Sequence, residues 1–309
     1  MVTPFPTTVT YKVAGDHEIK LDLFRPAGEQ PVPVVVWLHG GALIAFGRDS
    51  IYQRTGILEQ CLAAGLAVVV IDYRLAPETK LPAILDDVKD AFGWVQQQGP
   101  AHGLDPARVG VVGLSAGGYL ALMSGFMVSP RPTAIVSYYG YGDIAGDWYA
   151  KPDDFYNRMP AISDEDAWSR VGTDPISAPD LATSLGRMRF YYWTRQRGSW
   201  PTHVFGPHPL TDRAAFGPVC PIQNVDADWP PTLLVHGTAD TDVPYEQSVL
   251  MRDALTAAGA AATLITLDGA PHVFDRDITS ADLTAPQPTP VAQACTESIA
   301  FLAAYLLPA

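Results

Sequence analysis

Residues 108–127 read "RVGVVGLSAGGYLALMSGFM", and this stretch predicts a strand, a sharp turn and a helix in succession. The apolar run before the turn is typical of a buried strand, and the segment after it is long enough for a core helix. Between the two, Gly113, Ser115 and Gly117 form the pattern G-x-S-x-G. Glycines there allow a tight turn that projects the serine from strained backbone at the helix N-terminus. The pattern indicates that Ser115 is a nucleophile; a glycine-rich turn with a capping serine is the weaker alternative.

Similar apolar runs lie on both sides of this stretch. They read "VPVVVWLHGG", "LAVVVIDYR", "TAIVSYYGYG", "PTLLVHGTAD" and "AATLITLDGAPH", and each ends in a glycine-rich or polar loop. Nearly continuous runs rich in Val and Ile are typical of strands that are buried on both faces. The sequence therefore predicts an α/β fold with a mostly parallel central sheet and helices on both faces.

Other segments predict the elements around this sheet. "TTVTYKVAG" and "HEIKLDLFRP" alternate polar and apolar residues around Gly15-Asp16, which indicates an antiparallel hairpin at a sheet edge. Helices are expected over 81–99, 244–260 and 291–307, where apolar residues recur at three- and four-residue spacing. In the second of these helices, the predicted buried stripe contains Val249, Leu250, Ala254 and Leu255.

Residues 143–230 break the alternation of strands and helices. This segment holds five of the seven tryptophans and many tyrosines. A structureless loop of that length is implausible in a compact domain. We therefore expect an inserted cap, helical in part, that follows the sixth strand and lies over the strand ends. The expected organisation is a catalytic domain of residues 1–142 and 231–309 with a cap of residues 143–230.

Composition excludes several classes of protein. A net charge of −13 argues against a nucleic-acid partner, because phosphate binding requires clustered Lys and Arg. The three cysteines are scattered, without disulfide or metal-ligand spacing, so buried free thiols are expected and no metal site. The longest apolar runs are strand-sized, so no membrane span is predicted. The N-terminus lacks the basic start and apolar core of a signal peptide, which makes a cytoplasmic location the default unless a leader has been removed. A homo-oligomer remains an open expectation.

The segment "HGGA", residues 39–42, follows a predicted core strand. Acyl transfer needs hydrogen-bond donors aimed at the developing oxyanion, and glycines let backbone N–H groups approach closely. The N–H groups of Gly41, Ala42 and Ala116 are the expected donors. His39 and Gly40 are expected to support this loop, and His39 is more readily explained as a structural residue than as a catalytic one.

A nucleophilic serine needs a base, and the base needs an acid to hold it. In this architecture the chain order is serine, acid, histidine. Of the seven histidines, three precede Ser115, two lie in the expected cap and one precedes every carboxylate of its own loop (His17, His39 and His102; His203 and His208; His236). Only His272 satisfies the order. The preceding loop, "HGTADTDV", offers Asp240 or Asp242 as the acid, while Asp268 is expected to be structural.

Three motifs together carry a resemblance to a known family: "HGG", "DYRLAPE" at 72–78 and "GLSAGG". With them the chain resembles the hormone-sensitive-lipase-like serine esterases of the α/β-hydrolase fold, over residues 8–140 and 230–305. The resemblance implies that the acid is Asp240, through the arrangement G-x-x-D-x-x-V, and that Asp242 helps to shape the turn. It also implies that Arg74 and Glu78 support a loop near the site.

The sequence departs from the family pattern at three places. Ala42 stands where a third glycine is common, and Leu114 replaces an aspartate beside the serine. Strand-like sequence starts almost at residue 7, where the family usually has N-terminal cap helices, so we expect the cap to come largely from the central insertion.

The expected activity is hydrolysis of small to medium acyl esters by a Ser-His-Asp triad through an acyl-enzyme. The expected partner is a small-molecule ester substrate, and no metal or organic cofactor is implied. The same machinery is compatible with amide or formamide hydrolysis (arylformamidase-like) and with sugar deacetylation. A hydrolase-fold ligand receptor without turnover is a further alternative, although such proteins typically lose the serine or the histidine.

Overall fold

A computed structural model describes residues 5–307, so the outermost residues of the expected catalytic domain, 1–4 and 308–309, lie outside the described residues. One eight-stranded sheet has the order β1-β2-β4-β3-β5-β6-β7-β8. The strands are β1 Thr7–Ala14, β2 His17–Phe24, β3 Val32–Leu38, β4 Ala67–Ile71, β5 Leu104–Leu114, β6 Ala134–Tyr138, β7 Thr232–Gly237 and β8 Ala262–Leu267. β1 and β2 form the predicted antiparallel hairpin at the edge, and β3 to β8 are parallel. The predicted mostly parallel sheet is thus confirmed.

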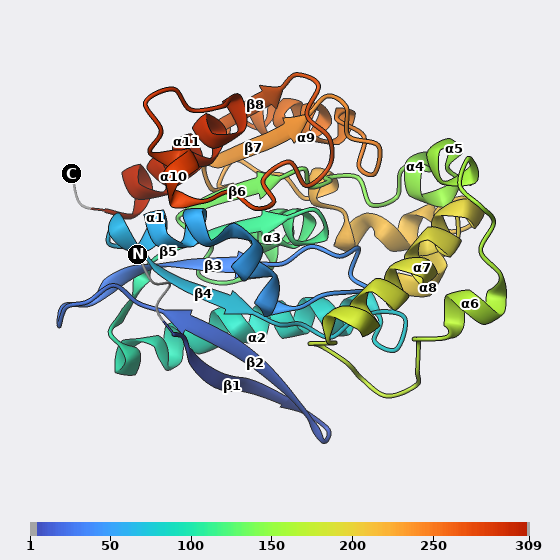
Figure 1. Ribbon diagram of the computed structural model, residues 1–309, viewed down its shortest axis with the longest axis horizontal. Helices are drawn as coiled ribbons and strands as arrows, with labels where there is room; N and C mark the ends of the chain where they lie inside the picture. The colour runs from blue at the N-terminus through green and yellow to red at the C-terminus, as the bar shows by residue number, and fades with distance from the viewer. Residues whose placement is uncertain (1–4, 308–309) are drawn as a thin grey trace.

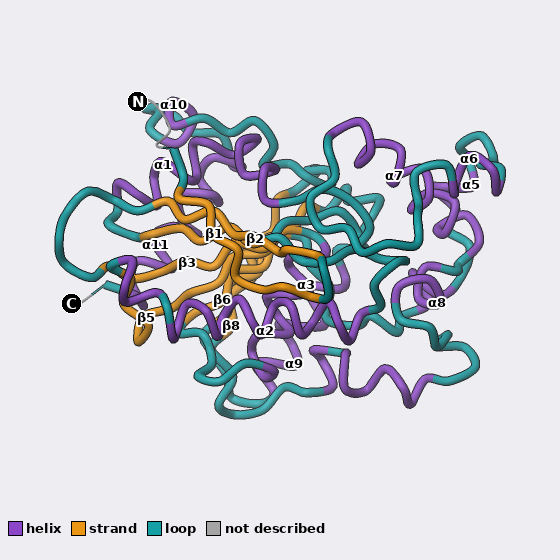
Figure 2. The backbone as a smooth tube through the Cα atoms, turned by 90° about the horizontal axis from the view of Figure 1, so that it is seen from below, coloured by secondary structure: helices purple, strands orange, loops and turns teal. Residues whose placement is uncertain are grey.

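Helices cover both faces of this sheet (Figures 1 and 2). They are α1 Thr55–Ala63, α2 Leu81–Gln97, α3 Ala116–Met127, α9 Glu246–Ala257, α10 Ser280–Leu283 and α11 Pro290–Leu306. Successive side chains of a strand point to opposite faces, so β3 contributes to two cores. Val34 and Val36 pack in the core that includes α2, α3 and α9, whereas Val35 and Trp37 pack in the core with α1, α10 and α11.

The face of α9 differs from the prediction. Leu250, expected in the buried stripe, is 46% exposed, and the buried residues include Gln247 and Ser248. These two polar side chains are buried because they make hydrogen bonds to the sheet side of the molecule. The Gln247 Oε1 atom accepts the backbone N–H of Asp143 at 3.0 Å, and the Ser248 hydroxyl bonds His236 at 2.7 Å. Hydrophobic periodicity alone misses a helix face that is held inward by hydrogen bonds.

Residues 143–230, hereafter the insertion, connect β6 to β7 and are helical in part. Their helices are α4 Asp147–Ala150, α5 Asp154–Asn157, α6 Asp164–Trp168, α7 Leu181–Arg197 and α8 Trp200–Val204, followed by 3-10 helices at Arg213–Val219 and Pro221–Gln223. α4 to α8 gather beyond one end of the sheet (right in Figure 1). That end carries the loops after β3 and β7, because Trp200 donates to the Ala42 carbonyl and Arg195 donates to Asp242.

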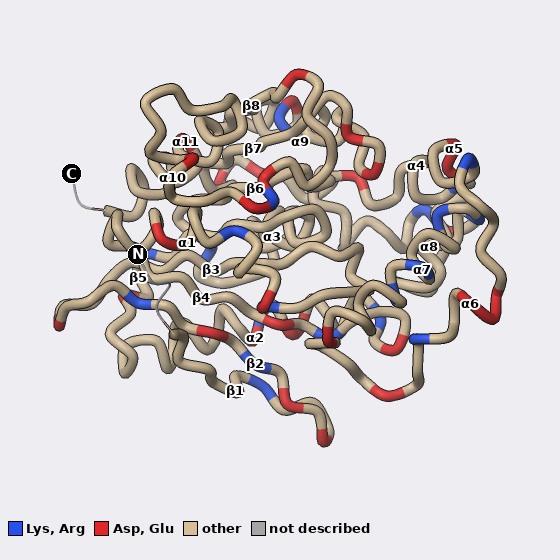
Figure 3. Tube along the Cα trace, in the orientation of Figure 1, with Lys and Arg blue, Asp and Glu red and all other residues tan. Residues whose placement is uncertain are grey.

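Charges on α7 are neutralised by carboxylates. Its basic residues stand out in Figure 3, and four of them form ion pairs: Arg187 with Glu78, Arg189 with Asp166, Arg195 with Asp153 and Asp242, and Arg197 with Asp164. The Arg187–Glu78 pair is buried, with both side chains 1% exposed. Arg187 also donates to the Ile44 carbonyl at 2.6 Å. Glu78 of "DYRLAPE" therefore helps to join the insertion to the loop after β3.

Two other expectations can be compared with the described residues. Cys61, Cys220 and Cys295 are buried free thiols, as predicted. Within residues 5–307, no helix is both long enough and apolar enough to cross a membrane.

Candidate active site

Ser115 lies at the turn between β5 and α3. Its backbone has φ 55° and ψ −118°, a region that non-glycine residues rarely adopt. The turn needs glycines on both sides, because a Cβ atom at Gly117 would overlap the Leu38 carbonyl oxygen and one at Gly113 would overlap the Gly117 carbonyl. The serine is 7% exposed. A side chain held on strained backbone at a strand-to-helix turn is suited to nucleophilic attack.

His272 and Asp240 complete a chain of hydrogen bonds with Ser115. The Nδ1 atom of His272 lies 2.6 Å from Oδ2 of Asp240, and its Nε2 atom lies 3.1 Å from Oγ of Ser115. A carboxylate only accepts, so the proton resides on Nδ1 and Nε2 is free to accept the serine proton. The structure thus brings together the three residues predicted as nucleophile, base and acid.

Asp240 is held by four donors. Its Oδ1 atom accepts the backbone N–H groups of Asp242 at 2.8 Å and Val243 at 2.9 Å. Its Oδ2 atom is contacted by His272 and also by Nε2 of His236 at 3.2 Å. Burial alone would raise the pKa of Asp240, but the hydrogen bonds from His236 and His272 outweigh it and hold the pKa well below its ordinary value. The group therefore remains a carboxylate.

His272 is surrounded by acidic groups. Burial alone would lower its pKa, but the charges of Asp242 and Asp240 outweigh burial, so the pKa of His272 is raised. Asp242 contributes because its Oδ2 atom lies 3.4 Å from Nε2 of His272, the same nitrogen that faces Ser115. Both carboxylates of "ADTD" therefore touch the histidine, Asp240 at Nδ1 and Asp242 at Nε2.

The partners of Asp242 were not predicted. Its Oδ1 atom accepts from the Tyr156 hydroxyl at 2.8 Å, from the Tyr191 hydroxyl and from Nη1 of Arg195 at 3.0 Å. The family resemblance implies only that Asp242 helps to shape the turn beside Asp240. The insertion is rich in Arg and Tyr, which is compatible with such a cluster, but composition does not say which of these residues contacts Asp242.

The loop after β3 has the geometry of a donor loop. Gly41 has φ 111° and Ala42 φ 57°, and the N–H groups of Ile44 and Ala45 turn back to the Gly41 carbonyl at 2.8 and 3.0 Å. Trp200 of α8 donates to the Ala42 carbonyl at 3.0 Å, a contact that sequence reasoning missed. Among residues 5–307, the N–H groups of Gly41 and Ala42, the two expected oxyanion donors of this loop, have no backbone partner.

His39 is packed beneath this loop. Its ring stacks on Tyr73 with centroids 4.1 Å apart, and its Nδ1 atom lies 2.7 Å from the Gly40 carbonyl. Burial lowers the pKa of His39 to about 4, so the ring is neutral near pH 7. These contacts agree with a bracing role rather than with proton transfer.

A family model described as BD-FAE matches residues 21–255, most of the chain. The chain belongs to the BD-FAE family. Membership in this esterase-like α/β-hydrolase family confirms the resemblance predicted from "HGG", "DYRLAPE" and "GLSAGG".

Solved structures share the fold of this BD-FAE protein. A protein of unknown function from Staphylococcus aureus subsp. aureus Mu50 superimposes with TM-score 0.76 at 19% identity, covering 98% of this chain and 100% of that one. EstE1, a carboxylesterase cloned from a metagenomic library, gives 0.70 at 21%, covering 100% and 92%. The Thermogutta terrifontis esterase Est2 with propionate bound gives 0.68 at 20%, covering 100% and 98%. The α/β-hydrolase fold is thereby confirmed.

Curated relatives are much longer than this BD-FAE chain. The non-reducing polyketide synthase adrD of Penicillium rubens is 29% identical in an alignment of 315 positions, gaps included, that covers 87% of this chain and 12% of the synthase. The 5-methylorsellinic acid synthase of Aspergillus terreus is 30% identical over 89% of this chain and 13% of its own length. The chain thus spans roughly an eighth of these relatives.

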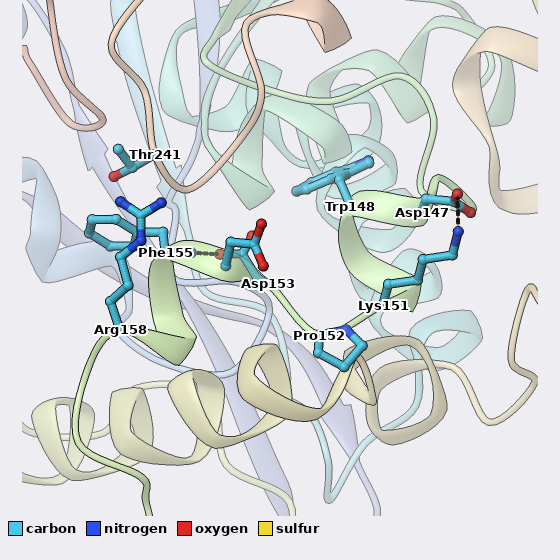
Figure 4. Close-up of a pocket in the computed structure, with 9 residues that line it drawn as sticks. Asp147, Trp148, Lys151, Pro152, Asp153, Phe155, Arg158 and Thr241 are labelled. Carbon is cyan, nitrogen blue, oxygen red and sulfur yellow. Dashed lines mark hydrogen bonds and ion pairs between the residues drawn. The ribbon is translucent and has the colours of Figure 1, made fainter.

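An open cavity of about 500 Å³, lined by both charged and apolar side chains, lies beside the loop after β7 of this BD-FAE protein (Figure 4). Thr241, between the two aspartates, forms one side of it, and α4, α5 and the residues between and after them form the other, including Trp148, Asp153 and Arg158. Among residues 5–307, no group of three His, Cys, Asp or Glu side chains is arranged to hold a metal ion.

Behind His272, a buried ion pair joins its loop to the helix before α1. Arg54 pairs with Asp275, and these side chains are 5% and 0% exposed. Tyr139 donates to Asp275 and presents its ring edge to His272 at 4.7 Å. We expect Arg54→Met to lower the free energy of unfolding by about 3–5 kcal/mol, because it leaves a buried carboxylate without its cation. Urea denaturation measures this loss.

The exposed pair Arg252–Asp253 provides the matched control, since its side chains are 38% and 60% exposed. Arg252→Met should change the unfolding free energy little, because exposed pairs are screened by solvent. Equal effects of the two substitutions would contradict the assigned role of the buried pair.

Proposed function

We propose that this BD-FAE protein is a serine carboxylic-ester hydrolase that acts on small to medium acyl esters through an acyl-enzyme. The observation that carries the proposal is the chain of contacts from Ser115 Oγ to His272 Nε2, 3.1 Å, and from His272 Nδ1 to Asp240 Oδ2, 2.6 Å. Esterases among the structures of the same fold agree with it. The synthetic activity of the polyketide synthases does not follow, because the chain matches only 12–13% of their length.

In the proposed reaction, Oγ of Ser115 attacks the ester carbonyl while Nε2 of His272 takes its proton. Asp240 keeps the imidazole in the required tautomer and stabilises its charged form. The N–H groups of Gly41, Ala42 and Ala116 hold the oxyanion. His272 then gives the proton to the departing alcohol oxygen. Water, activated by the same histidine, hydrolyses the acyl-serine and regenerates the enzyme.

A substrate panel tests this function. Short acyl esters, N-formyl aromatic amines and acetylated sugars are compared by kcat/KM, with Ser115→Ala as the blank. We expect the esters to be hydrolysed fastest. A preference for N-formyl aromatics or for acetylated sugars would replace the proposal by the formamidase or deacetylase alternative. No turnover of any compound by folded protein would favour a ligand receptor.

The pH dependence of kcat/KM follows from His272. The base is active when neutral, so activity falls as pH drops through its pKa. Burial lowers the pKa of His272, but the nearby charges of Asp242 and Asp240 outweigh it and raise the pKa. The fall of kcat/KM on the acid side should therefore be centred above about 6.5, the pKa of an unperturbed histidine. Asp242→Asn removes one of these charges and should move the limb to lower pH. An unmoved limb in the variant would contradict the assignment.

A further inference from the structure

We propose that Asp242 determines specificity for the alcohol part of the ester, by accepting a hydrogen bond from a donor group that the alcohol carries next to its ester oxygen. This inference rests on the proposed ester hydrolysis. It gives the second carboxylate of "ADTD" a role of its own, distinct from the hold that Asp240 exerts on His272.

The position of Oδ2 of Asp242 carries the first step. This atom lies 3.4 Å from Nε2 of His272. In ester hydrolysis the same nitrogen hands its proton to the leaving oxygen, so that oxygen has to come within about 3 Å of Nε2. A hydroxyl on the second carbon of the alcohol, three bonds beyond the leaving oxygen, therefore lies within reach of Oδ2.

The two oxygens of Asp242 differ in their surroundings. Oδ1 is saturated by three donors, from Tyr156, Tyr191 and Arg195. For Oδ2, the only hydrogen bond or ion pair among residues 5–307 is the contact with His272, and the side chain is 16% exposed. A carboxylate oxygen has room for more than one donor, so Oδ2 retains capacity on the side where the alcohol leaves.

Arg195 makes the carboxylate a fixed feature of the site. Its side chain is 1% exposed and it pairs with Asp153 as well as with Asp242. Its guanidinium also lies over the rings of Tyr149 and Tyr156, each 4.9 Å from the ring centroid. Locked partners hold an acceptor in place without an entropic cost at binding, which makes it selective.

A fixed, negatively charged acceptor favours alcohols that carry a hydrogen-bond donor and disfavours those that carry an acceptor in its place. An alcohol with a hydroxyl on the carbon next to the ester-bearing carbon can donate that hydrogen to Oδ2. An alcohol with an ether oxygen at the same place cannot donate, so two acceptor oxygens face each other and Oδ2 loses water without gaining a hydrogen bond. Sites built to bond a substrate hydroxyl reject analogues that lack it strongly, because the buried polar group of the site is then unpaired.

The test compares 2-hydroxyethyl butanoate with 2-methoxyethyl butanoate, which share an acyl group and differ at the donor. Wild-type protein is expected to prefer the hydroxyl ester by about tenfold to a hundredfold in kcat/KM, the effect of one hydrogen bond to a charged group. A wild-type ratio near one overturns the inference without any variant. No hydrolysis of either ester, or hydrolysis that persists in Ser115→Ala, instead overturns the proposed function and this inference with it.

Asp242→Asn sharpens the test. Three donors surround Oδ1, so the amide oxygen of asparagine takes that place and its NH₂ group replaces Oδ2. The acceptor facing the alcohol becomes a donor, and the preference should disappear or invert toward the methoxy ester. A ratio unchanged from wild type would contradict the role of Asp242.

Asp153→Asn is the matched control. Asp153 pairs with the same guanidinium at 2.5 Å and caps α5 through the N–H groups of Phe155 and Tyr156. Asparagine is also a good N-cap, and among the described residues the ion pairs of His272 are with Asp240 and Asp242 rather than with Asp153. The hydroxyl-to-methoxy ratio should stay at its wild-type value. If Asp153→Asn changed the ratio as much as Asp242→Asn, the effect would belong to Arg195 and not to Oδ2.

Discussion

Ser115→Ala is expected to lower kcat by about 10⁶-fold, the loss seen when the nucleophile of a comparable triad is removed. The reason is that the acyl-enzyme can no longer form, and what remains is binding and oxyanion stabilisation. Among the residues that the structure describes, Ser115 is the serine whose hydroxyl contacts Nε2 of His272, at 3.1 Å. Esterase turnover and labelling by a fluorophosphonate probe, read as a mass increase, measure the loss.

Ser124→Ala is the control for this substitution. Ser124 lies in the same helix, α3, is buried, and donates to the Ala121 carbonyl at 2.6 Å. It should retain probe labelling and turnover. Labelling that survives in Ser115→Ala, in protein with an unchanged circular dichroism spectrum, would show that the nucleophile is another residue.

Asp240→Asn is expected to lower kcat by about 10⁴-fold, as tautomer loss does in comparable triads. Oδ1 accepts two backbone N–H groups, so the asparagine oxygen has to occupy that place. Its NH₂ group then faces Nδ1 of His272, which becomes an acceptor, and the ring proton moves to Nε2. In that tautomer the histidine cannot take the proton of Ser115. Steady-state kinetics on a simple ester measure the loss.

Asp242→Asn should cost far less turnover on the same simple ester, because Nδ1 of His272 keeps its carboxylate. The comparison separates two neighbouring aspartates that contact the same ring at opposite nitrogens. If Asp242→Asn were the more damaging substitution, the acid would be Asp242 and the register G-x-x-D-x-x-V would have misassigned it.

The parts of the site that could be predicted are those set by local chain geometry. Gly113 and Gly117 mark a turn that no other residue fits, and that constraint is visible as a pattern around Ser115. Chain order then left His272 as the candidate base, since parallel strands bring their carboxyl ends to one edge. The structure brings both residues together with Asp240, while their catalytic roles remain the proposal tested above.

Other features could not be predicted because they depend on pairs distant in the chain. The inward face of α9 is set by hydrogen bonds to His236 and Asp143, which apolar periodicity does not register. Trp200 and Arg187 reach the carbonyls of the loop after β3 from 158 and 143 residues away. A single tryptophan or arginine in a sequence does not name the carbonyl to which it donates.

By itself, the sequence determined the parallel sheet and the strand-turn-helix around Ser115, because apolar period and glycine placement are local properties. Only the tertiary structure decided which residues Asp242 contacts. Its partner Arg195 lies 47 residues before it, on α7, which folds back against the loop that carries Asp242. In the folded chain, Oδ1 contacts residues of the insertion and Oδ2 contacts His272. The sequence does not show which groups face the two oxygens of a carboxylate, because those groups are brought together only by folding.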